Sequence, residues 1–201
     1  CTQTAPNRKY SLRALMFASG IWLMLIGLIC NGALRDGIES WVPTFLKEQF
    51  NISASRASFA SVMVPLISLS GTYTANWLNY KYIKNELYTA GLMFAVATLA
   101  VVGVFFTREV NVFVCAFFLS LSTAAMWGSN HMFLTQLPYQ FSTYGMSAAL
   151  TGFLNSVIYF ASAAGSCLYG ILADLNNDWN IVIYVWLASG VVGTIFCYIS
   201  G

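Results

Sequence analysis

Long uncharged stretches alternate with short polar segments along the whole chain. From Ala14 to Leu34 no side chain is charged, and a helix over these residues would extend about 31 Å at roughly 1.5 Å per residue. That length is sufficient to cross the hydrocarbon core of a bilayer. The pattern therefore predicts an all-α, polytopic membrane protein with six transmembrane helices, at about residues 12–45, 55–80, 87–107, 112–137, 144–173 and 181–200.

The polar segments define the expected domain organisation. Residues 1–11 are mostly polar and are predicted to be the remnant of a cytosolic linker, so that one six-helix transmembrane domain covers residues 12–201. The longest uncharged stretch, 110–173, is long enough for two crossings. We expect it to break at 136–143, where Pro138 and several polar residues cluster.

The basic residues of the short loops indicate the orientation. Cytoplasmic loops carry an excess of Lys and Arg, so we expect a multi-pass protein of the cell (inner) membrane with both termini in the cytoplasm. The side that holds the amino terminus has Arg8, Lys9, Arg13, Lys81 and Lys84, and the other side has Lys47, Arg56 and Arg108.

Composition excludes other classes of protein. With 58% hydrophobic residues, 8% charged residues and a mean hydropathy of +0.69, the chain is expected to lie in the lipid bilayer. A net charge of +2 is too small to indicate a nucleic-acid partner. The five cysteines have no Cys-x-x-Cys spacing, so we interpret them as small hydrophobic residues and expect neither a metal site nor a cofactor.

One arginine follows the first long uncharged stretch. A helix that continues past Arg35 would place Asn31 and Glu39 on the same face, four residues to either side, and the next strong helix breaker is Pro43. An arginine at membrane depth costs at least ~2.5–3.5 kcal/mol and usually serves a pathway or a ligand. Spacing leaves two interpretations open: Arg35 extends to the interface and pairs with Asp36 or Glu39, or it faces a water-filled cavity and binds an anion.

The residues that follow Arg35 carry a resemblance to a known family. The run Leu34-Arg35-x-Gly37-Ile38-x-x-Trp41-x-Pro43-Thr44-Phe45-Leu46-Lys47-Glu48 resembles the start of the C-terminal half of major facilitator transporters. It is most similar to the organophosphate:phosphate antiporters, which include glycerol-3-phosphate and hexose-phosphate transporters. It departs from them at Asp36, where the glycerol-phosphate members carry an aromatic residue.

The resemblance implies a function and a partner. The residue that matches Arg35 lies in the central cavity of these transporters and holds the substrate phosphate, and a second arginine from the N-terminal half completes the clamp. The expected partners are a small anionic substrate, the lipid bilayer and an N-terminal six-helix half of the same transporter. Such folds move one half against the other around a site near the midplane, so we expect that this chain does not transport on its own.

Three further polar side chains lie within predicted helices. His131 is the single histidine, and it either bonds a neighbouring helix or contacts a proton or substrate in the cavity. Asn155 and Tyr159 share a helix face and either bond between helices or contact a substrate hydroxyl. The small residues from Ser68 to Thr74 favour close helix contact. The candidate substrate-binding residues are therefore Arg35, Asn31, His131, Asn155 and Tyr159.

Other functions are compatible with a six-helix membrane protein. Within the same fold, the alternatives are a proton-coupled symporter or exporter of another organic anion, and a sensor that binds without transporting. A six-helix intramembrane enzyme such as a serine protease needs a serine activated by a histidine. Ser129 and His131 point to different faces of one helix, no second histidine exists and no Gly-x-Ser-x-Gly occurs. The sequence therefore predicts a transporter and not an enzyme.

Overall fold

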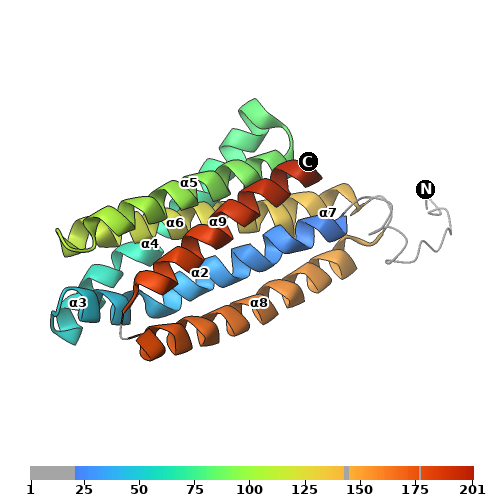
Figure 1. The fold of residues 1–201 in the computed structure, drawn as a ribbon. Coiled ribbons are helices and arrows are strands. Elements are labelled where there is room, and N and C mark those ends of the chain that lie inside the picture. The colour runs from blue at the N-terminus through green and yellow to red at the C-terminus, as the bar shows by residue number, and fades with distance from the viewer. Residues whose placement is uncertain (1–20, 143–144, 177) are drawn as a thin grey trace, which may run out of the picture.

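The described part of the chain is a bundle of helices (Figure 1). The computed structural model describes residues 21–142, 145–176 and 178–201. The predicted linker at 1–11 and the predicted start of the first helix at residue 12 lie outside these residues. The helices are α2 (Ile21–Gln49), α3 (Ala54–Ser61), α4 (Met63–Leu78), α5 (Glu86–Thr107), α6 (Val112–His131), α7 (Leu137–Gln140), α8 (Ser147–Asn176) and α9 (Asn180–Ser200), with two π-helical turns, η1 (Asn79–Ile83) and η2 (Met132–Gln136).

The lengths and hydropathy of these helices fit a membrane. In the part of the chain that the structure describes, four helical stretches are long and apolar enough to cross a bilayer: Glu86–Thr107, Val112–Gln140, Ser147–Leu175 and Asn180–Ser200. α2 and the α3–α4 pair complete a set of six helical rods in these residues. The prediction of an all-helical, polytopic membrane protein is confirmed.

Asparagine and serine side chains begin three of the helices. Asn85 accepts hydrogen bonds from the backbone N–H groups of Leu87 and Tyr88 at 2.9 and 3.1 Å. Asn111 does the same at the start of α6, and Ser53 caps α3. These side chains satisfy backbone donors that have no partner within the helix. They explain why the chain turns sharply between rods.

Prolines affect the rods in different ways. The helix is interrupted at Val62, between α3 and α4, three residues before Pro65. The proline nitrogen has no hydrogen to donate to the Ser61 carbonyl, which weakens the helix at this turn. At Pro43, by contrast, α2 continues for six further residues to Gln49. Pro43, a helix breaker by residue type, therefore does not end this helix, and the predicted span to about residue 45 already extended past it.

Pro138 explains the π-helical turn at the end of α6. A proline at this position cannot donate to the Leu134 carbonyl. The backbone instead forms a wider turn in which the Leu137 N–H donates to the Met132 carbonyl, and Thr151 of α8 donates its hydroxyl to the Leu134 carbonyl at 3.4 Å. A neighbouring helix thus supplies the hydrogen-bond donor that the Leu134 carbonyl lacks, as backbone groups within a membrane require. The helix continues past Pro138 and ends at Gln140, within the predicted break at 136–143.

α2 lies at the centre of the bundle. It packs against α6, α8 and α9, while α4 packs along α6, and α5 lies between α6 and α9 (Figure 1). Gly32 of α2 and Gly71 of α4 allow close approach, because a Cβ atom would overlap the carbonyl of Ile158 in α8 or of Ala124 in α6.

The predicted small-residue face of α4 is only partly a helix contact. Ser68 and Gly71 are buried against α6, and the Ser68 hydroxyl lies 3.0 Å from the Thr123 hydroxyl. Ser70 and Thr74 are exposed and donate to carbonyls of their own helix. The contact follows the 3–4 residue spacing of one helix face, which excludes the residues between.

Candidate functional site

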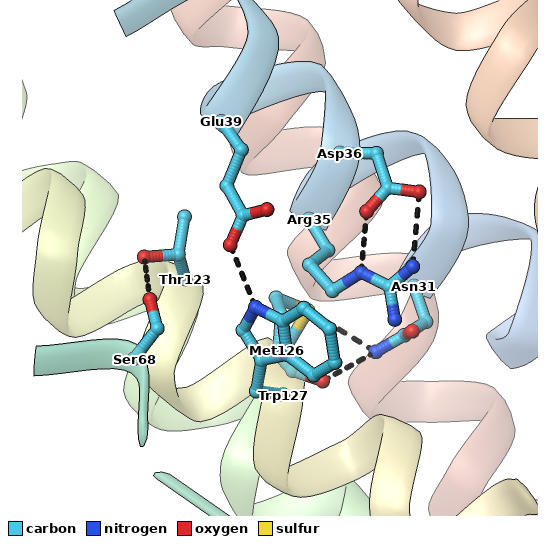
Figure 2. A network of polar contacts seen from close by, with 8 residues as sticks. All are labelled: Asn31, Arg35, Asp36, Glu39, Ser68, Thr123, Met126 and Trp127. Atoms are coloured by element: carbon cyan, nitrogen blue, oxygen red, sulfur yellow. Dashed lines mark hydrogen bonds and ion pairs between the residues drawn. The ribbon is translucent and has the colours of Figure 1, made fainter. Parts of the chain in front are cut away.

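A row of polar side chains runs along the face of α2 that meets α6 (Figure 2). Asn31, Arg35 and Glu39 follow one another at intervals of four residues, so that they stack along one side of the helix. Asn31 is completely buried, Arg35 is 4% exposed and Glu39 is half-buried. Four-residue spacing predicts this row, and the helix is continuous through it.

Arg35 is held by a carboxylate and an aromatic ring. Its Nε donates to Asp36 Oδ1 at 2.5 Å, and its Nη2 donates to Asp36 Oδ2 at 2.9 Å. The guanidinium carbon lies 4.5 Å from the centre of the Trp127 ring, within the range of a cation–π interaction. The pairing with Asp36, part of one of the two interpretations that the spacing left open, is present, but in a buried position and not with the side chain extended to the interface.

Asn31 joins the same row to the backbone of α6. Its Nδ2 donates to the Met126 carbonyl at 2.9 Å, while its Oδ1 is buried without a hydrogen-bond partner. A buried acceptor without a donor is costly. A ligand that carries a hydroxyl beside an anionic group would satisfy this oxygen.

Glu39 lies one turn beyond Arg35 and contacts the other part of Trp127. Its Oε1 accepts a hydrogen bond from Trp127 Nε1 at 2.6 Å (Figure 2). Glu39 and Trp127 also line a cavity of about 650 Å³ between α2, α3, α4 and α6. The remaining walls are apolar side chains and hydroxyls, among them Ser58, Ser61, Ser68 and Thr72.

The charges of this row do not balance. Arg35 contributes one positive charge, while Asp36 and Glu39 contribute two negative charges when ionised, which gives a net charge of −1. Among the described residues, no group of three or more His, Cys, Asp or Glu side chains could hold a metal ion. The site therefore has one strong anion-binding group, and that group is already paired.

The other predicted site residues lie apart from this row. His131 Nε2 is 3.3 Å from Gln136 Nε2, which donates to Asn76 Oδ1 at 3.2 Å. Asn155 is half-buried on α8, and Tyr159 is 61% exposed. Within residues 21–142, 145–176 and 178–201, no hydrogen bond or ion pair joins these three residues to Arg35.

Two participants were not identified as site residues from the sequence. Trp127 belongs to the run Trp127-Gly-Ser-Asn-His131, in which the predicted site residue is the histidine. Nothing in the spacing of α6 indicates which of its residues face α2, because α6 contains apolar and small residues on all sides. Asp36 is adjacent to Arg35 in the sequence, and only the geometry gives its bidentate pairing.

Comparisons with known proteins give distant relatives. No model of a known protein family matches the chain. It is 21% identical over 169 residues to the "Phosphoglycerate transporter protein" of Salmonella typhimurium, which covers 83% of this chain and 36% of that protein. It is 23% identical over 197 residues to "Probable anion transporter 5, chloroplastic" of Oryza sativa subsp. japonica, covering 94% of this chain and 40% of that protein.

A third relative is similarly distant and is also named as a transporter. "Probable anion transporter 6, chloroplastic" of Arabidopsis thaliana is 23% identical over 192 residues, which are 90% of this chain and 35% of that protein. The chain thus spans between 35% and 40% of the length of the curated relatives it matches. All three are named as transporters and none as an enzyme, which agrees with the prediction that this chain is not an enzyme.

Proposed function

We propose that this chain is the C-terminal six-helix half of a major facilitator-type transporter for a small anionic solute, and that Arg35 binds the anionic group. The proposed reaction is secondary active transport by alternating access, with an organophosphate or phosphate-linked antiport as the first candidate. The observation that carries the proposal is the buried guanidinium of Arg35, which contacts Asp36 and the Trp127 ring between α2 and α6.

Physical chemistry supports an anion as the ligand of Arg35. A guanidinium is planar and presents five N–H donors that match the oxygens of phosphate or carboxylate. Asp36 uses two of these donors. An arginine buried at this depth is expensive and is usually associated with a pathway or a ligand.

The comparisons support a membrane transporter that is longer than this chain. The relatives are named as phosphoglycerate and anion transporters, and each is more than twice as long as the segment it shares with this chain. An N-terminal six-helix half would supply the remaining part of the site and a second positive charge. Six membrane crossings would also place both termini on one side, which we propose to be the cytoplasm.

The remaining candidates have separate roles in this proposal. Asn31 accepts a hydrogen bond from a substrate hydroxyl through its free Oδ1. The helices that would border the cavity after the two halves assemble carry His131, Asn155 and Tyr159. We assign these residues to contacts with the substrate or with the N-terminal half in the assembled transporter. Plant relatives carry chloroplastic names, whereas we propose the cell (inner) membrane for this chain, in the orientation that its basic loop residues indicate.

Replacement of Arg35 by lysine tests the proposal. In the full-length protein reconstituted in liposomes, we expect Arg35→Lys to reduce uptake of labelled phosphate or 3-phosphoglycerate at least tenfold, because an ammonium cannot reproduce the planar fork. Arg108→Lys is the matched control. Arg108 is also mostly buried, pairs with the next residue, Glu109, at 3.7 Å and lies 4.6 Å from the Phe105 ring.

Two results would contradict the proposed function. Uptake by Arg35→Lys at the rate of Arg108→Lys would show that Arg35 is a structural cation. Uptake of neutral solutes with no competition from phosphate or carboxylates would remove the anion from the proposal. Expression level and thermal stability of both variants in detergent show whether a loss of uptake reflects a loss of folded protein.

A further inference from the structure

We infer that Asp36 is a built-in competitor of the transported anion at Arg35, and that it must release the guanidinium, by taking up a proton, before a tetrahedral oxyanion binds tightly. The inference rests on the proposed function, since it assumes that Arg35 is the anion-binding group. It adds a residue that sets affinity, and it couples anion binding to protons.

The geometry of the pair carries the first step. Asp36 binds through both carboxylate oxygens to the edge of Arg35 formed by Nε and Nη2, at 2.5 and 2.9 Å. This is one of the edges of a guanidinium that a phosphate or sulfate group can bind with two parallel hydrogen bonds. The carboxylate of Asp36 therefore occupies the position of a ligand oxyanion.

The surroundings close off one face of Arg35. Trp127 covers that face at 4.5 Å, and an incoming oxyanion binds the in-plane N–H donors along the edges of the guanidinium. On the other edge, formed by Nη1 and Nη2, an anion would lie close to the negative charge of Asp36 and be repelled. Exchange with Asp36 avoids this repulsion, since protonated Asp36 carries no charge.

The accessibility of the two side chains supports the exchange. The Arg35 side chain is 5% exposed, whereas that of Asp36 is 20% exposed. Asp36 is thus the member of the pair that water, and a proton from water, reaches first. Arg35 becomes available only when Asp36 turns away.

Among the residues that the structure describes, neighbouring charged groups form no other ion pair with Asp36. On α2, Glu39 has the same charge as Asp36 and bonds to Trp127. Of the helices packed against α2, α3 carries Arg56, α6 carries His131, α8 carries Asp174 and α9 carries no charged side chain. The ion pairs among the residues described are Arg35–Asp36 and Arg108–Glu109. A proton is therefore the exchange partner that the surroundings leave for Asp36.

The charge balance gives the direction of the pH effect. One proton from water adds to a carboxylate oxygen of Asp36, the ion pair opens, and the oxyanion takes its place on Arg35. The net charge of the Arg35–Asp36 pair changes from 0 to +1 before the anion enters. Anion affinity should therefore rise as the pH falls, and a variant without this carboxylate should lose that dependence.

Sulfate binding to the purified protein in detergent tests the inference. Sulfate serves as the probe because it stays doubly charged between about pH 5 and pH 8, whereas phosphate titrates in this range. We expect Asp36→Asn to tighten sulfate binding about tenfold or more at pH 7.5 and to flatten its pH profile. Asp36→Glu should retain the charge and the wild-type profile.

Two variants with the same loss of charge serve as controls. Glu39→Gln removes a carboxylate one turn away that has no contact with Arg35, and Glu109→Gln removes the acid of the Arg108 pair. We expect less than a threefold change in sulfate affinity for Glu39→Gln and none for Glu109→Gln. If Glu39→Gln raises sulfate affinity as much as Asp36→Asn does, the gain comes from the loss of any nearby negative charge. The exchange at Arg35 is then refuted.

Further results would overturn the proposed exchange between Asp36 and the anion. Weaker or unchanged sulfate binding by Asp36→Asn would show that Asp36 positions Arg35 and does not compete with the anion. If that variant does not fold, a wild-type sulfate affinity that is constant from about pH 8 to pH 5 overturns the inference by itself. Failure of the proposed function is distinguishable, because Arg35→Gln would then bind sulfate as tightly as the wild type.

Discussion

Trp127 contacts two charged residues of α2 with different parts of its side chain. The face of its ring covers the guanidinium of Arg35, and its Nε1–H donates to Glu39 at 2.6 Å. A phenylalanine would keep the ring and lose the donor, whereas a leucine would lose both. The two contacts can therefore be separated by substitution.

We expect Trp127→Phe to retain anion binding within about threefold and Trp127→Leu to weaken it about tenfold, since a desolvated cation–π contact contributes on the order of 1–2 kcal/mol. Sulfate titration of both variants in detergent provides the measurement. Trp77→Phe is the control, because Trp77 is an exposed tryptophan on α4 that lies near Lys81. Equal affinities for the phenylalanine and leucine variants would show that the ring does not hold Arg35.

The residues that α2 contributes to this site can be predicted from the sequence. The spacing of Asn31, Arg35 and Glu39 follows from helical periodicity alone, and the structure brings the three together on one face of α2. Trp127 could not be predicted, because the rotation of α6 about its axis depends on contacts with four other helices, α2, α3, α4 and α5. Local periodicity contains no information about such rotations.

At the scale of elements, close helix contacts depend on single glycines. A Cβ atom at Gly71 would overlap the backbone of Ala124, so α4 and α6 would have to separate to accept a side chain. Without a hydrophobic force between helices in lipid, such close packing provides much of their association.

Gly71→Val should therefore lower the thermal stability of the protein in detergent by several degrees, consistent with a cost of about 1–3 kcal/mol for overpacking. Gly152→Ala is the matched control. Gly152 lies on α8 with no atom within 4 Å of the added Cβ, and alanine is the better helix former. Its melting temperature should be equal to or above that of the wild type, and a loss as large as that of Gly71→Val would contradict the packing argument.

Element types were easier to predict than element ends. Hydropathy and length identify the helices, since a bilayer leaves few other structures for an uncharged segment. α2 ends at Gln49 and not at about residue 45, and the helix that contains Pro138 ends at Gln140 and not at about residue 137. In the second case, Thr151 from another helix satisfies the backbone carbonyl that the proline leaves free, and a contact so distant in sequence leaves no local signal.

At the scale of the whole molecule, the proposed function leaves this chain with only part of the site. The row on α2 carries a net charge of −1, so stable capture of an anion requires positive charge from elsewhere or uptake of protons. The proposed N-terminal half would supply the first, and Asp36 the second.

We expect liposomes that contain this chain alone to show no uptake of labelled phosphate above empty liposomes, because alternating access needs two halves that move against each other. Co-reconstitution with the N-terminal half should restore uptake. Substitution of Arg35 by glutamine in the co-reconstituted protein should abolish it again. Uptake by the monomeric chain alone would refute the two-half mechanism.

The π-helical turns η1 and η2 have a mechanical consequence for the bundle. Each lies at the end of a rod, and Gln136 of η2 bonds to Asn76, close to η1. A π turn holds one residue more than an α turn. If the extra residue shifts along the helix, the segment beyond it rotates by roughly 100° about the helix axis, and the helical structure is kept. Each π turn thus supplies one extra residue at a helix end, and the Gln136–Asn76 hydrogen bond joins these two ends.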